Sequence, residues 1–406
     1  MQTPRPLAVS EAQERVLARF RRCGAETTAL GRALGRTLAA DLLAASDLPS
    51  FTNSAMDGYA LRAADIIGAS DSTPVTLRVI GMQPAGTTAA PPVGPGEAVA
   101  ITTGAPLPVG ADAVARVEDT DGGAATVAIH RPLLPGTNMR RQGETIHSGQ
   151  MFLNAGTRLN PGKIALFAAA GVAQPSVVRR PRVALLSTGH ELVPAGQPLR
   201  AGQIADVNGP MLTALVAQYG GEAIPLGIAR DTPDDLRRIL ASVGDVDLIV
   251  TSGSVSVGAY DAVRAVIAER GALDFWQVRM RPGRPVAFGH IGETPILALP
   301  GNPVAAFVAF SLLARPALAR MLGQSPEIPQ TMRVRVHATL ENRGGRQAYL
   351  RAAVVATSTG WEVAAVMEQG SGNVVALAAA NALIVIPEGI ANVPAGAMVD
   401  ALLLNG

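Results

Sequence analysis

The 406-residue sequence has a single cysteine, Cys23, and few aromatic residues, which make up 3% of the chain. One cysteine excludes an internal disulfide and any metal site made of several thiolates, and it fits a reducing, cytoplasmic environment. The scarcity of aromatic side chains argues against the stacking surfaces that hold single-stranded nucleic acid. Disulfide scaffolds and base-stacking proteins are therefore excluded.

A large excess of charge of one sign and long hydrophobic runs are missing too. Lys and Arg number 34 against 32 Asp and Glu, so no general surface for polyanions is predicted. The longest apolar runs, such as 304–314, are well short of the ~20 residues that a membrane span needs. The first residues also lack the apolar stretch of a secretory signal. We expect neither a nucleic-acid partner nor a membrane.

The apolar content of 48% is ample for several cores, and a chain of this length predicts two to four domains. Ser10 is a candidate N-cap for a first helix, and Leu30, Leu34 and Leu38 continue the helical spacing. Residues 49–139 instead contain short β-type runs separated by glycine and proline. A helical pattern returns at 163–173. We therefore predict a β-rich module inserted into a helical unit.

From Val183 onward, strand, loop and helix alternate, which predicts a doubly wound parallel sheet. After Pro326 apolar and polar residues alternate, as expected for a separate β domain. The prediction is a multidomain α/β protein with β modules. Its expected domains are a helical linking domain (1–49 and 140–176), an inserted β-rich domain (50–139), an α/β domain (177–326) and a C-terminal β-barrel-like domain (327–406).

Polar loops follow the predicted parallel strands, where ligands of open α/β sheets bind. They read STGHEL (187–192), RDTPDD (230–235), TSGSVSVGAYD (251–261) and LPGNP (299–303). Small residues let the backbone approach a ligand, and the helix starts offer free N–H groups to an anion. A helix cap is the simpler interpretation of Asn302 alone, but four such loops on one edge favour a phosphate or anion site. The candidate contacts are Ser187, Thr188, Gly189, Ser252, Gly253, Ser254, Pro300, Gly301, Asn302 and Pro303.

Three acids, Glu191, Asp231 and Asp261, fall in these loops. Carboxylates are ligands for Mg²⁺, which substrate phosphates can also coordinate. The alternative for Asp231 is a turn or cap residue. Arg279, Arg281 and Arg284 surround a Pro-Gly turn in RMRPGRP and suit bidentate contacts to phosphates or oxyanions. For that cluster taken alone, a solvated hairpin is the simpler alternative.

Several familiar motifs are absent. HELVP (190–194) is not HExxH, because Pro194 stands where a second histidine is required, so His190 is better interpreted as a loop residue. Neither a GxxxxGK[ST] loop nor a GxGxxG after a strand occurs, which disfavours P-loop ATPases and Rossmann dehydrogenases. The stretch NSAMDGYAL (53–61) contains an acid, Asp57, that has two possible interpretations. Asp57 before Gly58 is either an Asx-turn residue or an acid that reaches outward from the β module.

Six ordered motifs resemble one family over nearly the whole chain. They are SAMDGYA (54–60), TTGAPLP (102–108), STGHEL, SVSVGAYD (254–261), RPGRP (281–285) and LPGNP. The chain resembles the molybdopterin molybdenumtransferases, which include MoeA and the gephyrin E domain. The resemblance implies four domains, a homodimer, and Mg²⁺-dependent insertion of molybdate into adenylylated molybdopterin with release of AMP, in molybdenum cofactor biosynthesis.

Carried over position by position, the resemblance implies active-site roles for Asp57, Thr103, Glu191, Asp231, Asp261, Pro300 and Pro303. Glu191, Asp231 and Asp261 would hold the metal, and Asp57 would act on the active site of the partner subunit. The departures are Thr52 and His190 where aspartate is frequent, Ser254 where glycine is usual, and Gln277 and Arg281 where lysines are common. Gln277 lacks a charge, which bears on oxyanion affinity.

Two other functions stay as alternatives. The first is a non-catalytic, gephyrin-like scaffold that binds a peptide partner. The second is a molybdopterin adenylyltransferase, although the loop Thr251-Ser252-Gly253 lacks the Thr-Gly-Gly-Thr-Gly typical of that class. The expected partners beyond the second subunit are small-molecule substrates and transient contacts with a molybdopterin adenylyltransferase and molybdoenzyme chaperones. The sequence does not separate molybdate from tungstate, since both are tetrahedral oxyanions.

Overall fold

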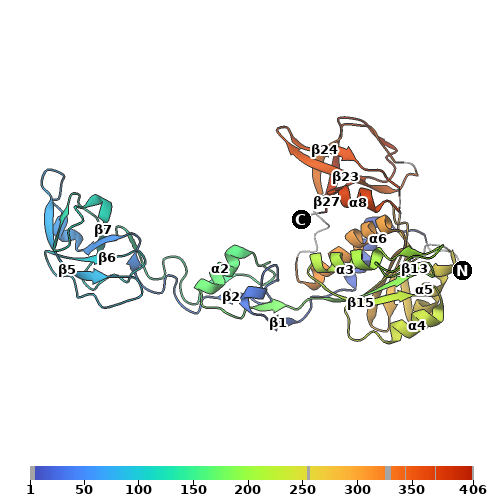
Figure 1. Ribbon diagram of the computed structural model, residues 1–406, viewed down its shortest axis with the longest axis horizontal. Helices are drawn as coiled ribbons and strands as arrows, with labels where there is room; N and C mark the ends of the chain where they lie inside the picture. The colour runs from blue at the N-terminus through green and yellow to red at the C-terminus, as the bar shows by residue number, and fades with distance from the viewer. Residues whose placement is uncertain (1–4, 254–256, 325–330, 343, 371, 405–406) are drawn as a thin grey trace. The chain divides into compact units, whose positions relative to one another are not determined.

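The computed structural model describes residues 5–253, 257–324, 331–342, 344–370 and 372–404. The chain divides into two compact units, each considered separately (Figure 1). The first unit comprises Met1–Thr27, Gly35–Ala39 and Ser176–Gly406, and the second comprises Thr28–Leu34 and Ala40–Pro175. The predicted α/β region belongs to the first unit, and the predicted β-rich module belongs to the second.

A six-stranded sheet in the order β15-β12-β16-β20-β19-β17 forms the centre of the first unit. The first four strands are parallel, as predicted. At one edge β19 pairs antiparallel with β20, and β17 pairs antiparallel with β19, which was not foreseen. The strands are β12 (Arg182–Thr188), β15 (Glu222–Ala229), β16 (Leu248–Gly253), β17 (Gly271–Gln277), β19 (Pro285–Ile291) and β20 (Thr294–Pro300).

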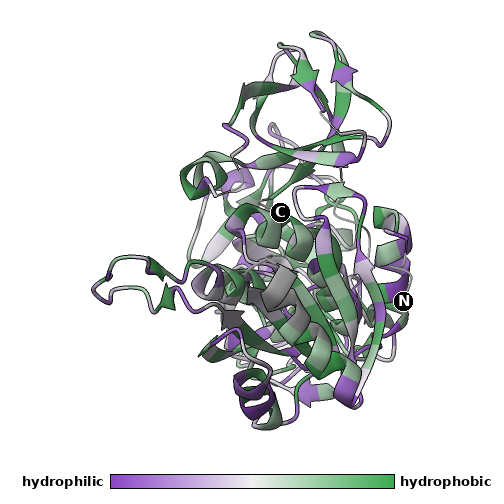
Figure 2. Cartoon of the chain, turned by 90° about the vertical axis from the view of Figure 1, so that its right-hand side faces the viewer, coloured by the Kyte–Doolittle hydropathy of each residue, from purple (hydrophilic) through white to green (hydrophobic). Residues whose placement is uncertain are grey.

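Helices cover both faces of this sheet, which is the doubly wound arrangement. Figure 1 shows α3 and α6 on one side and α4 and α5 on the other, and the apolar contacts form two separate clusters accordingly. Figure 2 shows hydrophobic colouring along the central strands. Their buried runs need no polar alternation because each face meets a helix. The helices are α3 (Asn208–Gln218), α4 (Pro233–Ala241), α5 (Val257–Arg270) and α6 (Pro303–Ala309).

After α6 the chain continues as a single helical run through η4 (Phe310–Ala314) and α7 (Arg315–Met321). By length and composition Pro303–Met321 could cross a membrane, but 78% of its apolar window is buried inside the protein. A core helix meets the same criterion, so this run is weak evidence for a span. The expectation that the chain does not enter a membrane stays a prediction.

The N-terminal segment differs from its prediction in two ways. Helix α1 (Val9–Ala18) begins before Ser10, and its N-cap residue Ala8 makes no side-chain cap. The stretch that follows is not a continuous helix but β1 (Ala25–Thr27), η1 (Leu30–Arg32) and β2 (Leu42–Leu43). Gly35 has φ +74°, which an α-helix does not allow, and it interrupts the leucine spacing. Apolar spacing was not sufficient evidence for a helix there.

Around the central sheet, short pairs complete the first unit: β1 with β11 (Ser176–Val178), and β13 (Leu192–Val193) with β14 (Ile204–Ala205). Helix α1 packs against η4 and α7, so this helix is part of the core of the first unit. The prediction placed α1 in the linking domain instead.

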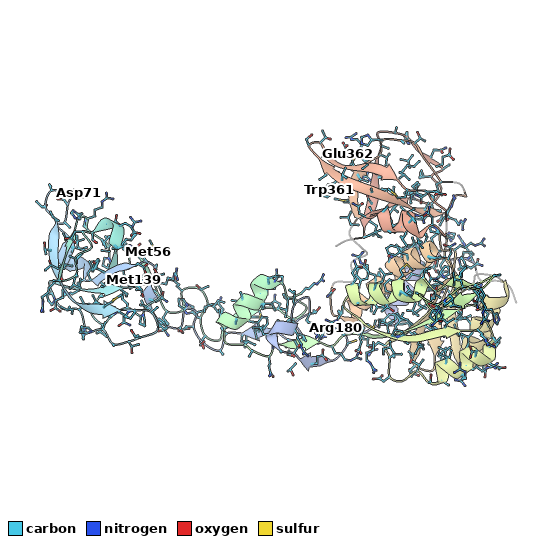
Figure 3. The ribbon with its side chains drawn as sticks, viewed as in Figure 1. Met56, Asp71, Met139, Arg180, Trp361 and Glu362 are labelled. Atoms are coloured by element: carbon cyan, nitrogen blue, oxygen red, sulfur yellow. The ribbon has the colours of Figure 1, made fainter. Side chains whose placement is uncertain are left out.

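The C-terminal residues form the strand-rich domain that was expected. Pairing of β25 with β23 closes the order β23-β24-β21-β27-β25 into a ring, and the hairpin that carries Trp361 and Glu362 projects from it (Figure 3). Strand β18 (Met280–Arg281) of the arginine hairpin pairs with the start of β23. The elements are β21 (Thr331–Arg335), β22 (Leu340–Glu341), β23 (Gln347–Thr357), β24 (Gly360–Val366), α8 (Val374–Ala379), β25 (Ala382–Ile386), β26 (Asn392–Val393) and β27 (Met398–Leu403).

The second unit contains a five-stranded sheet in the order β7-β4-β6-β5-β8. Its strands are β4 (Gly58–Leu61), β5 (Val75–Gln83), β6 (Glu97–Ile101), β7 (Ala113–Arg116) and β8 (Thr126–Ile129), with η2 (Ala63–Ile66) and η3 (Val117–Asp119) beside them. Helix α2 (Pro161–Ala169) confirms the predicted return to helix, and Asn160 caps it. The remaining pairs are β2 with β10 (Met151–Leu153) and β3 (Asn53–Ser54) with β9 (Met139–Arg140), close to the labelled Met139 in Figure 3.

Candidate active site

The parallel strands of the first unit end in one row. The register pairs Ala229 with Thr188, Thr188 with Gly253, and Gly253 with Pro300. The chain leaves β12 through α3 toward β15, whereas it leaves the neighbouring β16 through α5 toward β17 at the opposite edge. That is the topological switch point at which open α/β sheets bind ligands. The loops singled out in the sequence therefore meet at one edge.

A cavity of about 370 Å³ opens at this edge. Seven of the predicted contacts line it: Thr188, Glu191, Ser252, Gly253, Gly301, Asn302 and Pro303. Pro300 is buried at the end of β20, and Ser187 is buried beneath the edge with its hydroxyl donated to Asp206 (2.8 Å). Gly189 and His190 line a neighbouring cavity of about 600 Å³. The loops thus form two adjoining hollows.

Two glycines make this edge possible. A Cβ on Gly253 would lie 1.7 Å from Oγ1 of Thr188, and a Cβ on Gly189 would lie 2.9 Å from Oε2 of Glu191. A side chain at position 253 would displace Thr188, and one at position 189 would make Leu192 and the carboxylate of Glu191 shift. The glycines of STGHEL and TSGS allow the loops to approach each other closely.

Asp231 and Glu191 are electrostatic neighbours on these loops. Burial, and next the like charge of Glu191, raise the pKa of Asp231 above its ordinary value, and Thr188 and His190 partly offset the rise. Oδ1 of Asp231 is buried without a hydrogen-bond partner. Two close carboxylates, one with an unsatisfied oxygen, fit the donor chemistry of a hard divalent cation.

The third predicted ligand is not described. The side chain of Asp261, on α5, and all of Ser254 lie outside the described residues. Among the groups that are described, no three His, Cys, Asp or Glu side chains come together as a metal site. The structure thus supports a pair of carboxylates, and the third stays a prediction.

The floor of the cavity is a polar network that the sequence analysis missed. Nδ2 of Asn208 donates to Oγ of Ser252 (2.8 Å) and to the carbonyl of Gly301 (2.7 Å), while Asp206 accepts from Ser187 and from the N–H of Gly209 (2.9 Å). The network ties the ends of β12, β16 and β20 together. Asp206 precedes α3 and Asn208 is its first residue, and the sequence analysis singled out neither of them.

Asn302 does not have the capping role that was the simpler interpretation. Its side chain makes no cap to α6, and its Oδ1 is buried without a partner at the cavity wall. Oδ1 of Asn208 is also buried without a partner. Buried amide oxygens are normally hydrogen-bonded, so these two are available to a ligand that carries N–H or O–H donors. By contrast, Thr232 does cap α4, accepting from the N–H of Asp235.

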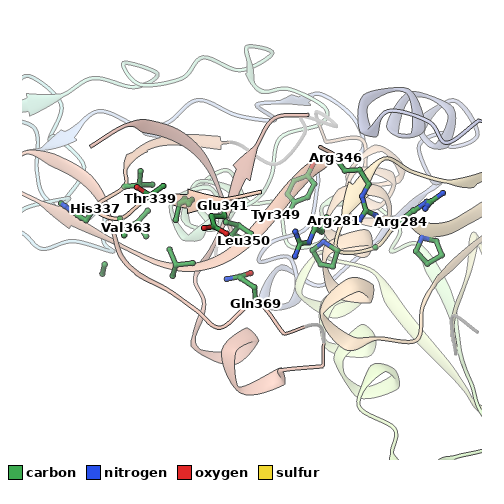
Figure 4. Close-up of a pocket in the computed structure, with 18 residues that line it drawn as sticks. Arg281, Arg284, His337, Thr339, Glu341, Arg346, Tyr349, Leu350, Val363 and Gln369 are labelled. Carbon is green, nitrogen blue, oxygen red and sulfur yellow. The ribbon is translucent and has the colours of Figure 1, made fainter. Parts of the chain in front are cut away.

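A larger cavity, of about 780 Å³, lies between the arginine hairpin and the C-terminal domain. Arg281 and Arg284 line it, together with Arg346, which was not predicted (Figure 4). Arg279 does not line it: its Nε donates to Oε1 of Glu388 (2.8 Å) and its Nη1 to the carbonyl of Pro6 (2.9 Å). The three arginines of the hairpin therefore have different surroundings.

Asp57 lies in the second unit, at the exposed start of β4. Its Oδ1 accepts hydrogen bonds from the backbone N–H (2.6 Å) and the hydroxyl (2.9 Å) of Thr103. The backbone bond and then the hydroxyl bond hold the pKa of Asp57 below its ordinary value. The two residues that the sequence analysis named in this module are thus in contact, and the carboxylate is oriented and ionised.

Packing against the neighbouring strand explains why residue 58 is a glycine. A Cβ there would lie 1.8 Å from the carbonyl oxygen of Ala115 on the neighbouring strand β7. Glycine at this position permits the close packing of β4 against β7, and it says nothing about a ligand. The Asp-Gly pair therefore combines an exposed acid with a buried strand contact.

Fold and site together define a multidomain protein with a ligand-binding α/β domain. Residues 7–171 match the MoeA N-terminal region (domain I and II), residues 184–320 a probable molybdopterin binding domain, and residues 333–404 the MoeA C-terminal region (domain IV). The chain belongs to the molybdopterin molybdenumtransferase family, as the six motifs predicted.

Similar proteins span its whole length. The molybdopterin molybdenumtransferase 2 of Mycobacterium tuberculosis is 40% identical over 96% of this chain and 97% of that protein. The molybdopterin molybdenumtransferase of Staphylococcus aureus is 34% identical over 98% and 96%. The crystal structure of the molybdopterin biosynthesis MoeA protein from Pyrococcus horikosii has a TM-score of 0.85, with 33% identity, and covers 99% of this chain and 100% of its own.

Proposed function

We propose that the protein is a molybdopterin molybdenumtransferase, which inserts molybdate into adenylylated molybdopterin with release of AMP in molybdenum cofactor biosynthesis. The observation that carries the proposal is the coupled pair Asp231 and Glu191 at the switch-point edge, beside a cavity lined by helix starts and glycines. That arrangement suits a substrate with a pyrophosphate group and a bound cation. The names of the relatives support the same reaction.

Glu191 and Asp231 would hold Mg²⁺, joined by Asp261. When bound, the ion neutralises phosphate charge and polarises the bond that breaks. The chain itself would contribute position and charge: Thr188, Ser252 and Gly253 line the cavity that would hold the phosphates, and Arg281 and Arg284 of RPGRP line the second cavity and would contact an anion. A nucleophilic side chain is not required, since holding the reacting groups in place supplies the catalysis.

Asp57 would act in the active site of the partner subunit of a cytoplasmic homodimer. Thr103 orients the ionised carboxylate of Asp57, which is exposed and so can contact a group outside its own β sheet. A two-fold axis gives each active site an Asp57 from the other chain. The proposed domains stay as predicted, with α1 reassigned to the α/β domain. Transient contacts with the preceding adenylyltransferase and with molybdoenzyme chaperones belong to the same proposal.

Molybdate-dependent release of AMP from adenylylated molybdopterin tests the function. We expect AMP and molybdenum-loaded cofactor when both Mg²⁺ and molybdate are present, and intact substrate when either is left out. Substrate that stays intact under all conditions, together with tight binding of a peptide partner, would favour the scaffold alternative. Consumption of ATP without molybdate would favour the adenylyltransferase. Repeating the assay with tungstate measures the preference between the two oxyanions.

A further inference from the structure

The orientation of Asp57 depends on two segments of the β-rich module. Asp57 ends the SAMD segment (54–57) directly before β4, and Thr103 belongs to the TTGA segment (102–105) directly after β6. Strands β4 and β6 pair antiparallel, so both segments lie at the same end of the sheet. Both hydrogen bonds from Thr103 reach one carboxylate oxygen. The carboxylate therefore keeps its orientation only while the two segments keep a fixed relative position.

Ser54 joins the two segments at their other end. Its backbone N–H donates to the carbonyl of Ala105 (3.0 Å), and its carbonyl accepts from the N–H of Gly104 (2.8 Å). Gly104 has φ +83°, a conformation that residues with a side chain rarely adopt. Two backbone bonds at one end and the Thr103 contact at the other therefore hold the segments side by side.

The hydroxyl of Ser54 determines the path of the chain between these two ends. The residue is 0% exposed, and its Oγ donates to the carbonyl of Met56 (2.6 Å) and accepts from the N–H of Met56 (3.3 Å). Met56, labelled in Figure 3, immediately precedes Asp57. A serine hydroxyl that bonds the backbone two residues ahead fixes a local turn. This turn therefore sets the direction in which the backbone enters Asp57.

The TTGA segment has an independent attachment to the sheet. The N–H of Thr102 donates to the carbonyl of Gln83 (3.2 Å), the last residue of β5, and Oγ1 of Thr102 accepts from the N–H of Ala85 (2.8 Å). The side chain of Gln83 is itself buried. Loss of the Ser54 hydroxyl should therefore move the acid relative to the TTGA segment instead of moving both together.

We propose that Ser54 is the positioning residue of Asp57: its buried hydroxyl shapes the SAMD segment so that the carboxylate meets both donors of Thr103. The inference rests on the proposed function, in which Asp57 acts in an active site, and it adds a residue that contacts no substrate. It also explains why a small hydroxyl residue begins the SAMDGYA motif. Alanine lacks the donor, and a larger side chain would be crowded at a fully buried position.

The main test is a carbon-13 NMR titration of the aspartate carboxyl groups in the whole protein, in which Asp57→Asn identifies the Asp57 signal. In Ser54→Ala we expect the pKa of Asp57 to rise toward its ordinary value, because a displaced carboxylate loses the hydrogen bonds that lower it. Ser54→Thr keeps the hydroxyl and should keep the low pKa, even if its extra methyl group reduces stability. An unchanged Asp57 pKa in Ser54→Ala would overturn the proposal.

The same variants are assayed for AMP release at neutral pH, where Asp57 is ionised in all that retain it. A slower reaction then reports the orientation of the carboxylate and not its protonation. We expect Ser54→Ala to release AMP about 3- to 10-fold more slowly, the effect of about one hydrogen bond. In a Thr103→Val background the same substitution should cost less, because one of the two contacts is already lost. An equal loss in both backgrounds would contradict the positioning role.

Ile129→Val is the matched control for a general loss of stability. Ile129 is 2% exposed on β8, at the far edge of the same sheet from β4. Its shortened side chain should lower the denaturant midpoint about as much as Ser54→Ala does. We expect the Asp57 pKa and AMP release to stay as in the wild type. If Ile129→Val changes both as Ser54→Ala does, the serine acts only through the stability of the module.

The titration needs no substrate, so this inference and the proposed function can fail separately. A protein that releases no AMP but shows the pKa rise in Ser54→Ala retains the positioning role and loses the proposed reaction. A protein that releases AMP, with the Asp57 pKa and the rate both unchanged in Ser54→Ala, retains the reaction and loses the positioning role. A pKa rise without any change in the rate would also overturn the inference, because the orientation would then not serve the reaction.

Discussion

Two acids, Asp57 and Asp231, mark the two units of the chain, and their surroundings are opposite. Asp57 is exposed and accepts two hydrogen bonds from Thr103, which lower its pKa. Burial, and next the like charge of Glu191, raise the pKa of Asp231, and one of its oxygens has no hydrogen-bond partner. Protein hydrogen bonds stabilise the charge of Asp57 within its own unit, whereas a bound cation would stabilise the charge of Asp231.

The difference assigns different roles to residues of one type. An ionised carboxylate that protein donors already orient can contact a ligand without a metal. A carboxylate forced against another carboxylate is stabilised when a cation binds between them. The following predictions test whether this division holds.

The largest effect is expected for the carboxylate pair. Glu191→Gln and Asp231→Asn should each reduce AMP release by more than about 100-fold, since losing even an outer partner of a metal ligand costs about 10- to 100-fold. Both substitutions keep the size of the side chain and change loop residues after strands, so the thermal unfolding temperature should change little. Activity and unfolding are measured on the same samples. A large loss of stability would show that the pair is structural.

Mixed dimers test where Asp57 acts. Asp57→Asn and Glu191→Gln homodimers should both be inactive, but a heterodimer of the two has one site in which both acids are intact. Such dimers, purified through different tags on each chain, should recover up to about half of the wild-type activity by the one-site-in-two argument. Heterodimers as inactive as their parents would place Asp57 in its own subunit.

A substitution of Gly58, next to Asp57, should affect folding rather than the active site. Gly58→Ala forces a Cβ to within 1.8 Å of a backbone carbonyl oxygen that cannot move freely. We expect the free energy of unfolding to fall by about 3 kcal/mol, the upper end of the cost of overpacking. Asp57→Asn is the matched control, because it changes an exposed side chain and should leave denaturant unfolding nearly unaltered. Equal losses for the two variants would contradict the assignment.

The sequence predicted the parallel strands and the loops after them because both depend on local patterns. Buried β runs, Thr232 with Pro233, and small residues after strands are visible one segment at a time. The switch-point rule then brings the loops together without knowledge of side-chain contacts.

What the sequence missed depends on contacts between distant segments. Asn208 bridges the ends of β16 and β20, and Arg346 meets a hairpin more than sixty residues earlier. No local spacing records either contact. The false helix after residue 24 failed for another reason, since a glycine with positive φ overrides a pattern of leucines. The prediction of a cap at Asn302 was wrong, because its side chain makes no hydrogen bond to α6 and the residue lines the cavity instead.

The carboxylate pair Glu191 and Asp231 should also affect the free energy of unfolding in the absence of substrate. Because the folded pKa of Asp231 is raised, ionisation opposes folding, so stability is present at low pH and is lost as pH rises through that pKa. Glu191→Gln leaves the burial of Asp231 in place and removes only the smaller, electrostatic cause, so at neutral pH it should raise the free energy of unfolding by a few tenths of a kcal/mol, after allowance for solvent screening. Mg²⁺ should stabilise the wild type and have little effect on this variant. If Mg²⁺ raises the free energy of unfolding equally in both proteins, the carboxylate pair is not the Mg²⁺-binding site.

The smallest effect is expected for Thr103→Val, which retains the backbone N–H bond to Asp57 and removes the hydroxyl bond. Since the backbone bond is the larger cause of the lowered pKa, most of the ionisation and part of the orientation should survive. We expect AMP release to fall about 3- to 10-fold at neutral pH, the cost of one hydrogen bond. The pKa of Asp57 should move up toward its ordinary value, so the acidic limb of the activity profile should shift to higher pH. Thr103→Ser, which keeps the hydroxyl, is the control and should resemble the wild type. A Val variant with an unchanged profile would mean that the hydroxyl does not hold Asp57 during the reaction.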